Sequence, residues 1–397
     1  MNLEIPHLTR DANAPWFSIM HLSDMHIAER SQDQDDMADA MVAFITDCIV
    51  NRIPKDAPLK AIDVDGDMLD HAIRLYQPAF KAFLKVLSFL IHVCAENDIV
   101  LRIMNGTWEH DHGQLRYVED LRDVMSPDCN LRVIDRIELE YIPELDLRYL
   151  YIPDDMPYES SQEIVDVVLE KMRELGWDYV DYACVHGFFD FTVPPVARAA
   201  QKIIYSESQF PFVRKLINAG HVHLHQKNGK VISNGNVDFI RFGETGPKGA
   251  VLVIDKKDQG ASSIFLENQF AAPYITLTYG DDKTTQEITD DITQAVSGIK
   301  TTRLIHLRVL IENKDIRTAI RTWLLDAFPH VLTKVGAPPR DSTKALEEDN
   351  SAPYGGVELP PMPTPETLAD YVYNRLSTKD GAVSQEEVTW ALKTRTK

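Results

Sequence analysis

Residues 59–67 read LKAIDVDGD, an apolar run that ends in Asp-Gly-Asp and predicts a buried β-strand. Residues 16–23 (WFSIMHLS) form a similar run, and residues 98–106 (DIVLRIMNG) form a third. Between these runs, apolar residues recur at helical spacing over 36–53 and 75–96. A strand–helix–strand–helix–strand order favours an α/β sheet with parallel strands.

The later part of the chain predicts a second sheet. Short strands over 130–155, a helix at about 160–175 and the strand YACVHGF (182–188) come first. The stretches VISNGNVDFI, KGAVLVID and SSIFLEN then look like antiparallel strands that close this second sheet. Two sheets with helices outside would make a four-layer α-β-β-α sandwich.

The spacing of these patterns divides the chain into four segments. Residues 1–272 are expected to form the main domain, and 273–335 a small α/β module. Residues 336–366 contain seven prolines and are expected to be a linker. Residues 367–397 are expected to form a helical tail.

Charge and composition exclude several classes of protein. The 397 residues carry 61 acids and 41 bases, a net charge of −20, which argues against coating nucleic acid through bulk charge. Divalent cations invert the local field, so an enzyme that acts on phosphates stays possible. Four scattered cysteines indicate reduced thiols in a cytoplasmic protein. No apolar run is long enough to predict a membrane span.

Five short stretches place metal-binding side chains after apolar runs: SDMH, GDMLD, WEHD, VHGF and GHVH. Asp24 and His26 are two positions apart, as are His221 and His223, so each pair can face the same way. Any one stretch is weak evidence, because a lone histidine after a strand, such as His186, is more often packed or on the surface. The ordered set indicates a site for borderline divalent ions, which would position water against phosphorus and stabilise the leaving oxygen.

With these motifs in this order, residues 16–255 resemble the calcineurin-like metallophosphoesterase superfamily, whose motifs run D-x-H, G-D-x-x-D, G-N-H-D/E, a lone H and G-H-x-H. The resemblance implies the four-layer fold and two divalent ions, with Mn²⁺ expected first and Mg²⁺, Fe²⁺ or Zn²⁺ as alternatives. The implied ligands are Asp24, His26 and His223 for one ion, Asp67 between the ions, and His186 and His221 for the second. His110 would stabilise the transition state or protonate the leaving group.

One motif departs from the family pattern, because WEHD replaces GNHD. Alignment on the His-Asp pair puts Glu109 at the position of the Asn ligand, and the alternative is that Asn105 swings in. We favour Glu109, since a carboxylate can replace an amide oxygen. Asp70, Asp111 and His225 are expected beside the ligands rather than on the metal.

Within that superfamily, the stretch after GHVH resembles SbcD-type DNA repair nucleases through its FGE…KG pattern, although Asn236 stands where Ser is usual. The small α/β module falls where those nucleases carry a DNA-capping domain. Residues 300–344 hold nine basic and four acidic residues, a net charge of +5. The side chains expected to meet DNA phosphates are Arg303, Arg308, Lys314, Arg317 and Arg321.

The resemblance also implies partners and a biological setting. The linker and tail resemble the tether by which such nucleases bind an SbcC-type, SMC-like ATPase, and the nuclease domains of that type form homodimers. The leading expectation is therefore a DNA exo- and endonuclease in repair, recombination or phage DNA processing, in the bacterial or phage-infected cytoplasm. One alternative is a phosphodiesterase or phosphatase for nucleotides or other small phosphates. Another is a non-catalytic scaffold that keeps the fold.

Overall fold

The computed structural model describes residues 5–8, 14–29, 32–154, 156–193, 197–299, 301 and 303–338. The helical tail at 367–397 and nearly all of the Pro-rich linker lie outside the described residues. The ATPase-binding role of the tail therefore stays a prediction.

The first sheet contains the strands that the opening motifs predict. Its strand order is β14-β13-β1-β2-β3-β4. Strands β1 to β4 are parallel, and β13 and β14 join antiparallel beside β1. The bounds are Phe17–Leu22 for β1, Leu59–Asp65 for β2, Val100–Met104 for β3, Leu131–Ile134 for β4, Gly249–Asp255 for β13 and Ala261–Glu267 for β14.

The second sheet has the order β11-β12-β10-β7-β6-β5. Its four central strands are parallel, while β5 and β11 run antiparallel at the edges. The bounds are Glu138–Ile142 for β5, Leu147–Ile152 for β6, Val180–His186 for β7, Val213–Gly220 for β10, Gln226–Asn228 for β11 and Val231–Ser233 for β12. A two-stranded parallel pair, β8 (Phe188–Phe189) and β9 (Ile204–Tyr205), follows β7.

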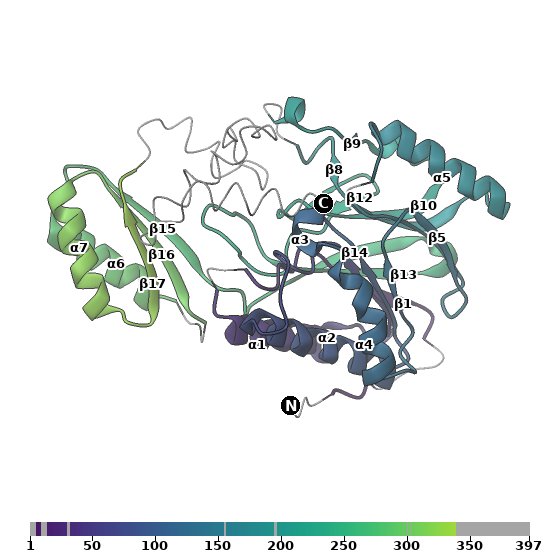
Figure 1. The fold of residues 1–397 in the computed structure, drawn as a ribbon, viewed down its shortest axis with the longest axis horizontal. Coiled ribbons are helices and arrows are strands. Elements are labelled where there is room, and N and C mark those ends of the chain that lie inside the picture. Colours follow the sequence, from purple (N-terminus) through teal and green to yellow (C-terminus); the bar gives the residue numbers. More distant parts are fainter. Residues whose placement is uncertain are drawn as a thin grey trace, which may run out of the picture. The chain divides into compact units, whose positions relative to one another are not determined.

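The two sheets and their helices form the predicted four-layer α-β-β-α sandwich. Figure 1 shows α1 (Gln34–Asp47), α2 (Pro78–Glu96) and α4 (Val118–Met125) together on one side, and α5 (Ser161–Leu175) on the other. The alternation of strand residues explains the layers. On β1, Met20 and Leu22 pack toward the helices, whereas Phe17 and Ile19 pack between the sheets. Helix α2 is long and apolar enough to cross a membrane, but ten of its residues are buried, as in a core helix.

The structure corrects the placement of the late strands. KGAVLVID and SSIFLEN form β13 and β14, and they extend the first sheet rather than the second. Of the stretch VISNGNVDFI only residues 231–233 form a strand, and β12 is parallel to β10. Alternating hydrophobicity shows which face of a strand is buried but not which strand is its neighbour.

The predicted small α/β module is a three-stranded parallel sheet, β15-β16-β17, with two helices and a hydrophobic core of its own. The bounds are Tyr274–Tyr279 for β15, Thr285–Ser297 for α6, Ile305–Ile311 for β16, Lys314–Ala327 for α7 and Val331–Gly336 for β17. Strand β17 ends inside the segment expected to begin the linker. Thr284 and Glu287 form a capping box at the start of α6, which offsets unsatisfied N–H groups there.

Short helical segments complete the described part of the chain. They are the π-helical turn η1 (Cys48–Arg52), α3 (Trp108–Asp111), and the 3₁₀ turns η2 (Gln114–Tyr117), η3 (Arg198–Ala200), η4 (Glu207–Gln209) and η5 (Lys257–Gln259). Helix α3 is the WEHD stretch itself, and three residues, 105–107, separate it from the end of β3.

Candidate metal centre

The predicted ligands meet where parallel strands of both sheets end. Asp24 and Asp67 follow β1 and β2 of the first sheet, while His186 ends β7 and His221 follows β10 in the second. In a parallel sheet the carboxyl ends lie along one edge, so strand-end side chains from distant parts of the sequence gather there. Three groups of converging donor atoms result, all within 4.8 Å inside each group.

The first group is Asp24, His26 and His223. The Nε2 atoms of the two histidines are 3.0 Å apart, and Nε2 of His223 is 3.6 Å from Oδ1 of Asp24. Only one of two nitrogens this close can carry a proton that points at the other. A cation bound by both nitrogens would avoid the contact of two N–H groups. Oε1 of Glu244 lies 2.8 Å from Nδ1 of His223, so Nε2 of that ring is left to face the site.

The second group is Asp67, His186 and His221. Nδ1 of His186 donates to the carbonyl of Asp65 at 2.7 Å, which turns Nε2 toward Oδ2 of Asp67 at 3.3 Å. That Nε2 is buried and has no hydrogen-bond partner among the described residues. Asp67 also belongs to a third group with His26 and His110, so its carboxylate could be shared by two ions.

The backbone at these residues is held in an uncommon conformation. Asp24, His26 and Asp67 have φ of 49°, 46° and 50°, and His221 has 86°. A positive φ is rare for a residue other than glycine, and it collects at functional sites where the surrounding fold enforces it. Gly106 allows the close approach behind Asp67, because a Cβ there would lie 2.1 Å from Oδ1 of Asp67.

Buried carboxylates and histidines shift one another's pKa. Burial alone would raise the pKa of Asp67, but the charge of His186, 3.3 Å away, holds it well below its usual value. Burial alone would lower the pKa of His223, but Asp24 and Glu244 raise it to about 9. Burial lowers the pKa of His221, and the charge on His186 adds to that effect. Metal binding at this centre would displace protons from histidines, so it is expected to weaken as pH falls.

The WEHD stretch corrects the assignment of Glu109. Its side chain is exposed on α3 and is not in any of the three groups. Thr107 contacts the second group instead: its N–H donates to Oδ1 of Asp67 at 2.6 Å, and its Oγ1 is 3.4 Å from Nδ1 of His221. The alternative ligand Asn105 has a buried Oδ1 with no hydrogen-bond partner among the described residues, so its role stays open.

The sequence reasoning missed a carboxylate beside the second group. Asp154 follows β6, and its Oδ2 is 3.7 Å from Nδ1 of His221 and 3.4 Å from Oγ1 of Thr107. The signal that could have found it is the one used for Asp24, namely an acid directly after an apolar strand. Glu244 lies in the FGE pattern noted in the sequence, but its contact with His223 was not foreseen.

The other residues expected near the ligands divide into two sets. Asp70 places Oδ1 3.5 Å from Nδ1 of His26, and Asp111 accepts from the N–H groups of Gly106 and Leu69 at 2.7 and 3.0 Å. Both therefore support the loops that carry ligands. His225 lies apart from the three groups, because its Nδ1 contacts the carbonyl of Ser233 and its ring stacks on Phe265.

The basic residues of the small α/β module do not form one free surface. Arg303 is buried, with ion pairs to Asp36 at 2.6 Å and Asp238 at 3.0 Å, so its predicted role on DNA phosphates is corrected to a structural one. Arg308 packs over the ring of Phe242, and Arg317 is half-buried. Of the five, only Lys314 and Arg321 are exposed.

The donor set fits two divalent ions. Two carboxylates and four histidines converge from both sheets, with one carboxylate shared, and among the described residues two buried imidazole nitrogens, Nδ1 of His26 and Nε2 of His186, have no hydrogen-bond partner. Oxygen and imidazole donors without thiolate suit Mn²⁺, Fe²⁺ and Zn²⁺ alike, so the donors set the class of ion rather than its identity.

Comparison with known proteins adds little to this geometry. Neither a scan against protein-family models nor a search of curated proteins gives a match. Among solved structures, TT1561 of Thermus thermophilus is similar at 12% identity and a TM-score of 0.36, with 64% of this chain and all of that chain covered. A second structure aligns at 13% identity and a TM-score of 0.35 over the same shares. Likeness at this level carries no argument, so the fold rests on the strand order and the site on its distances.

Separate substitutions of Asp154 and Glu109 should show which of the two carboxylates supports metal binding. Asp154→Ala is expected to weaken binding of one of two Mn²⁺ ions by about 10- to 100-fold, the usual effect of removing a group that supports a metal ligand. Glu109→Ala should leave both affinities unchanged, because Glu109 is exposed and outside the groups. Isothermal titration of metal-stripped protein measures both variants. A larger loss in Glu109→Ala than in Asp154→Ala would restore the original assignment.

Proposed function

We propose that this protein is a metal-dependent phosphodiesterase of the calcineurin-like class and that its substrate is DNA. The observation that supports the activity most strongly is the position of Asp67, whose carboxylate is shared by a group containing His186 and a group containing His26. A carboxylate shared by two sets of histidine and carboxylate donors can contact two adjacent ions at once, which suits a two-metal centre. Asp24, His26 and His223 would hold one ion, and His186 and His221 the other.

The chain's own residues supply orientation and a proton. Bound divalent ions polarise phosphoryl oxygens and activate water. Nδ1 of His110 lies 2.6 Å from the carbonyl of Asp70, which fixes the ring and leaves Nε2 3.9 Å from Oδ2 of Asp67. The ring therefore faces the centre with one nitrogen available to pass a proton to the leaving oxygen.

DNA as substrate is supported by exposed arginines and aromatic rings on loops beside this centre. We call Arg74, Tyr76, Trp108, Arg116 and Tyr117 the arginine–aromatic rim. Their loops are joined, because Gln114 makes two 2.8 Å hydrogen bonds with the backbone of Ile73. His110, which contacts the carbonyl of Asp70, ties the same loop to the centre.

The pairing within the rim suits single-stranded nucleic acid. Arg74 contacts the hydroxyl of Tyr76 at 3.0 Å, and Arg116 lies 4.7 Å over the ring of Tyr117. Trp108 is 58% exposed, although an indole is usually much more buried. Exposed rings stack on bases and arginines bind backbone phosphates, which is how proteins hold single strands without sequence preference.

The finer parts of the proposal rest on the SbcD resemblance. They are Mn²⁺ as the native metal, an SbcC-type ATPase as partner, homodimer formation, the DNA repair or phage setting, and the cytoplasm as location. A phosphodiesterase or phosphatase for small phosphates remains the competing function, favoured by the net charge of −20 and by the burial of Arg303.

A double substitution tests the substrate class. Arg74→Ala with Arg116→Ala is expected to raise the KM for a DNA duplex with single-stranded ends by roughly tenfold or more, since each phosphate contact and stacking partner adds to affinity. Hydrolysis of bis-p-nitrophenyl phosphate should be unchanged. The matched control is Arg136→Ala with Arg173→Ala, which removes the same charge from exposed positions elsewhere.

Steady-state kinetics on both substrates measures the outcome. An equal effect of the two double variants on DNA would reduce the rim to ordinary surface charge. Cleavage of the small diester with intact DNA in the unsubstituted protein would favour the small-phosphate function. Bound metal with neither substrate cleaved would favour the scaffold.

A further inference from the structure

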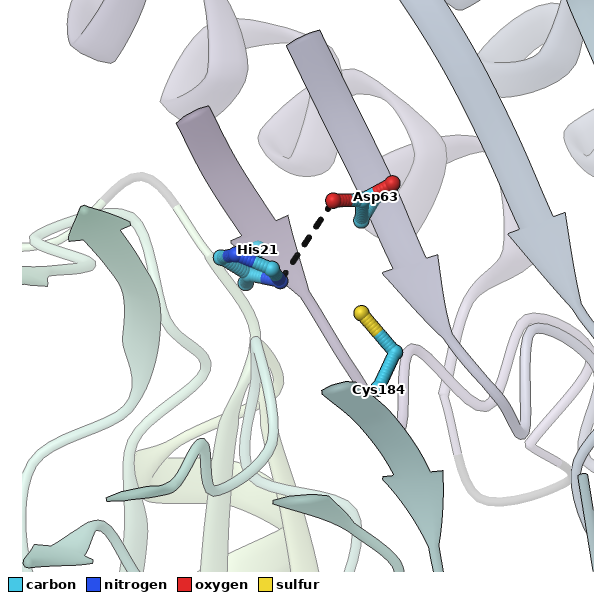
Figure 2. Close-up of side chains that lie close together, drawn as sticks. All are labelled: His21, Asp63 and Cys184. Carbon is cyan, nitrogen blue, oxygen red and sulfur yellow. Dashed lines mark ion pairs between the residues drawn. The ribbon is translucent and has the colours of Figure 1, made fainter. Parts of the chain in front are cut away.

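A fourth group of buried donor atoms lies between the two sheets and takes no part in the proposed reaction. It consists of His21 on β1, Asp63 on β2 and Cys184 on β7 (Figure 2). The donor atoms of these side chains lie within 4.8 Å of one another, and Nδ1 of His21 is 3.8 Å from Oδ2 of Asp63. All three side chains are almost completely buried, with 1% exposure or less.

The group stands on the inner faces of the sandwich. On β7, Ala183 and Val185 pack toward α5, so Cys184 faces the first sheet. On β2, Val64 packs toward the outer helices and Ala61 between the sheets, so Asp63 shares the inner face with Ala61. These three residues lie beside an apolar and aromatic cluster between the sheets that includes Tyr149, Tyr151 and Tyr182.

Asp63 has no hydrogen bond that would explain its burial. Neither of its carboxylate oxygens has a hydrogen-bond partner among the described residues. The nearby cation Arg102 is committed to Glu140 through two hydrogen bonds of 2.8 and 2.7 Å. A buried carboxylate without hydrogen bonds is strongly unfavourable, and its one ion-pair partner, His21, is 3.8 Å away and also contacts Asp65, so this position calls for a cation or a proton.

We propose that His21, Asp63 and Cys184 bind a structural ion of the zinc class. Tetrahedral zinc with N, O and S ligands places its donor atoms roughly 3.3–3.8 Å apart, which matches the His21–Asp63 separation. Oδ2 of Asp65 is 2.9 Å from Nδ1 of His21 and accepts from Nδ2 of Asn234 at 2.7 Å. An ion held by protein ligands that are all buried lies in a closed site, which is the structural rather than the catalytic type.

The donor chemistry separates this ion from the two at the strand ends. A thiolate and an imidazole favour Zn²⁺ over Mn²⁺ or Mg²⁺, whereas the catalytic centre has no sulfur among its described donors. The sites are close in sequence, because Cys184 precedes His186 by two residues. The carbonyl of Asp65 also accepts from His186. An ion here would join β1, β2 and β7 directly beneath the catalytic ligands.

Cobalt substitution tests the proposal in the full-length chain. Co²⁺ bound by a thiolate gives an intense near-ultraviolet charge-transfer band, and Co²⁺ bound only by histidine and carboxylate does not. Metal-stripped protein is refolded with Co²⁺, desalted and examined by absorption spectroscopy and metal analysis. We expect the thiolate band in the wild-type protein. Folded wild-type protein that binds Co²⁺ without this band would overturn the proposal.

Substitutions of two cysteines test whether the band arises from Cys184. Cys184→Ala should remove it together with one Co²⁺ per chain, whereas Cys94→Ala, a buried cysteine on α2, should keep both. Asp63→Asn should lower the Co²⁺ affinity of the same site. A band that persists in Cys184→Ala would contradict the assignment, and the wild-type spectrum decides the matter if that variant does not fold.

The proposal is independent of the proposed function, and the same samples show this. Phosphodiester hydrolysis without the thiolate band would refute the buried ion and support the enzymatic function. The thiolate band in a protein that hydrolyses neither DNA nor the small diester would support the buried ion and refute the enzymatic function.

Discussion

Asp67→Asn should abolish phosphodiester hydrolysis, with a loss of about 10³-fold or more in kcat/KM. The reason is that Asp67 is common to two of the three groups of donors, so one substitution disturbs both ions. A catalytic ion contributes several kcal/mol to the transition state, and each 1.36 kcal/mol is about a factor of ten in rate. The amide keeps the shape of the side chain but lacks the charge that faces His186 at 3.3 Å.

Metal content and activity are both measured for this variant. We expect fewer than two Mn²⁺ ions per chain at concentrations that saturate the wild-type protein. The matched control is Asp181→Asn, which removes a buried carboxylate at the opposite end of β7, where Oδ2 accepts from the N–H of Arg148. Full activity with normal metal content in Asp67→Asn would refute the shared-ligand geometry.

His110→Ala should lower kcat by roughly 10²- to 10⁴-fold while the protein keeps its metal ions, the range expected when a positioned proton donor is lost. The structure explains why kcat should fall while the metal content is kept. His110 is held by the carbonyl of Asp70 and faces Oδ2 of Asp67 at 3.9 Å, whereas each proposed ion keeps its other ligands. Parallel kinetics and metal analysis make the comparison.

The neighbouring His112 supplies the control. Its side chain is exposed, and its φ of 47° is one that Asn tolerates better than Ala, so His112→Asn is the suitable change. This variant should retain wild-type rates. Retained activity in His110→Ala would contradict the role given to His110, and loss of metal there would make it a ligand instead.

The sequence identifies most of the centre because its residues obey one rule. Asp24, Asp67, His186 and His221 each end or follow an apolar strand, and parallel strands bring such positions to one edge. The structure places these residues together as the ordered motifs predict. Their distances, the positive φ angles and the contact of Glu244 with His223 come only from the folded chain.

The WEHD assignment shows where local motif alignment fails. Alignment on the His-Asp pair makes Glu109 the ligand, but Glu109 is exposed and lies in none of the three groups of donors, whereas the N–H of Thr107 contacts Asp67. Trp108 and Glu109 form the start of α3, and both are exposed there. The motif letters alone do not show which way a side chain of that short helix points.

Charge counting fails for a related reason. The net charge of +5 over 300–344 suggests a DNA-binding surface. Arg303, however, forms ion pairs with Asp36 and Asp238, which are far away in sequence. The same limit explains the misplaced strands β13 and β14, since the neighbour of β13, strand β1, is far away in sequence. Local patterns predict elements and exposed faces, whereas partners at long range depend on the whole fold.

The most direct measurement of the central claim is metal-reconstituted hydrolysis by one preparation of the full-length chain. Metal-stripped protein would receive Mn²⁺, Mg²⁺ or Zn²⁺ and then a labelled DNA duplex with single-stranded ends, with bis-p-nitrophenyl phosphate in parallel and His110→Ala as control. We expect no hydrolysis without metal, and DNA cleavage that requires both Mn²⁺ and His110. Full occupancy of the Asp67 centre by metal with no cleavage of either substrate would contradict the account.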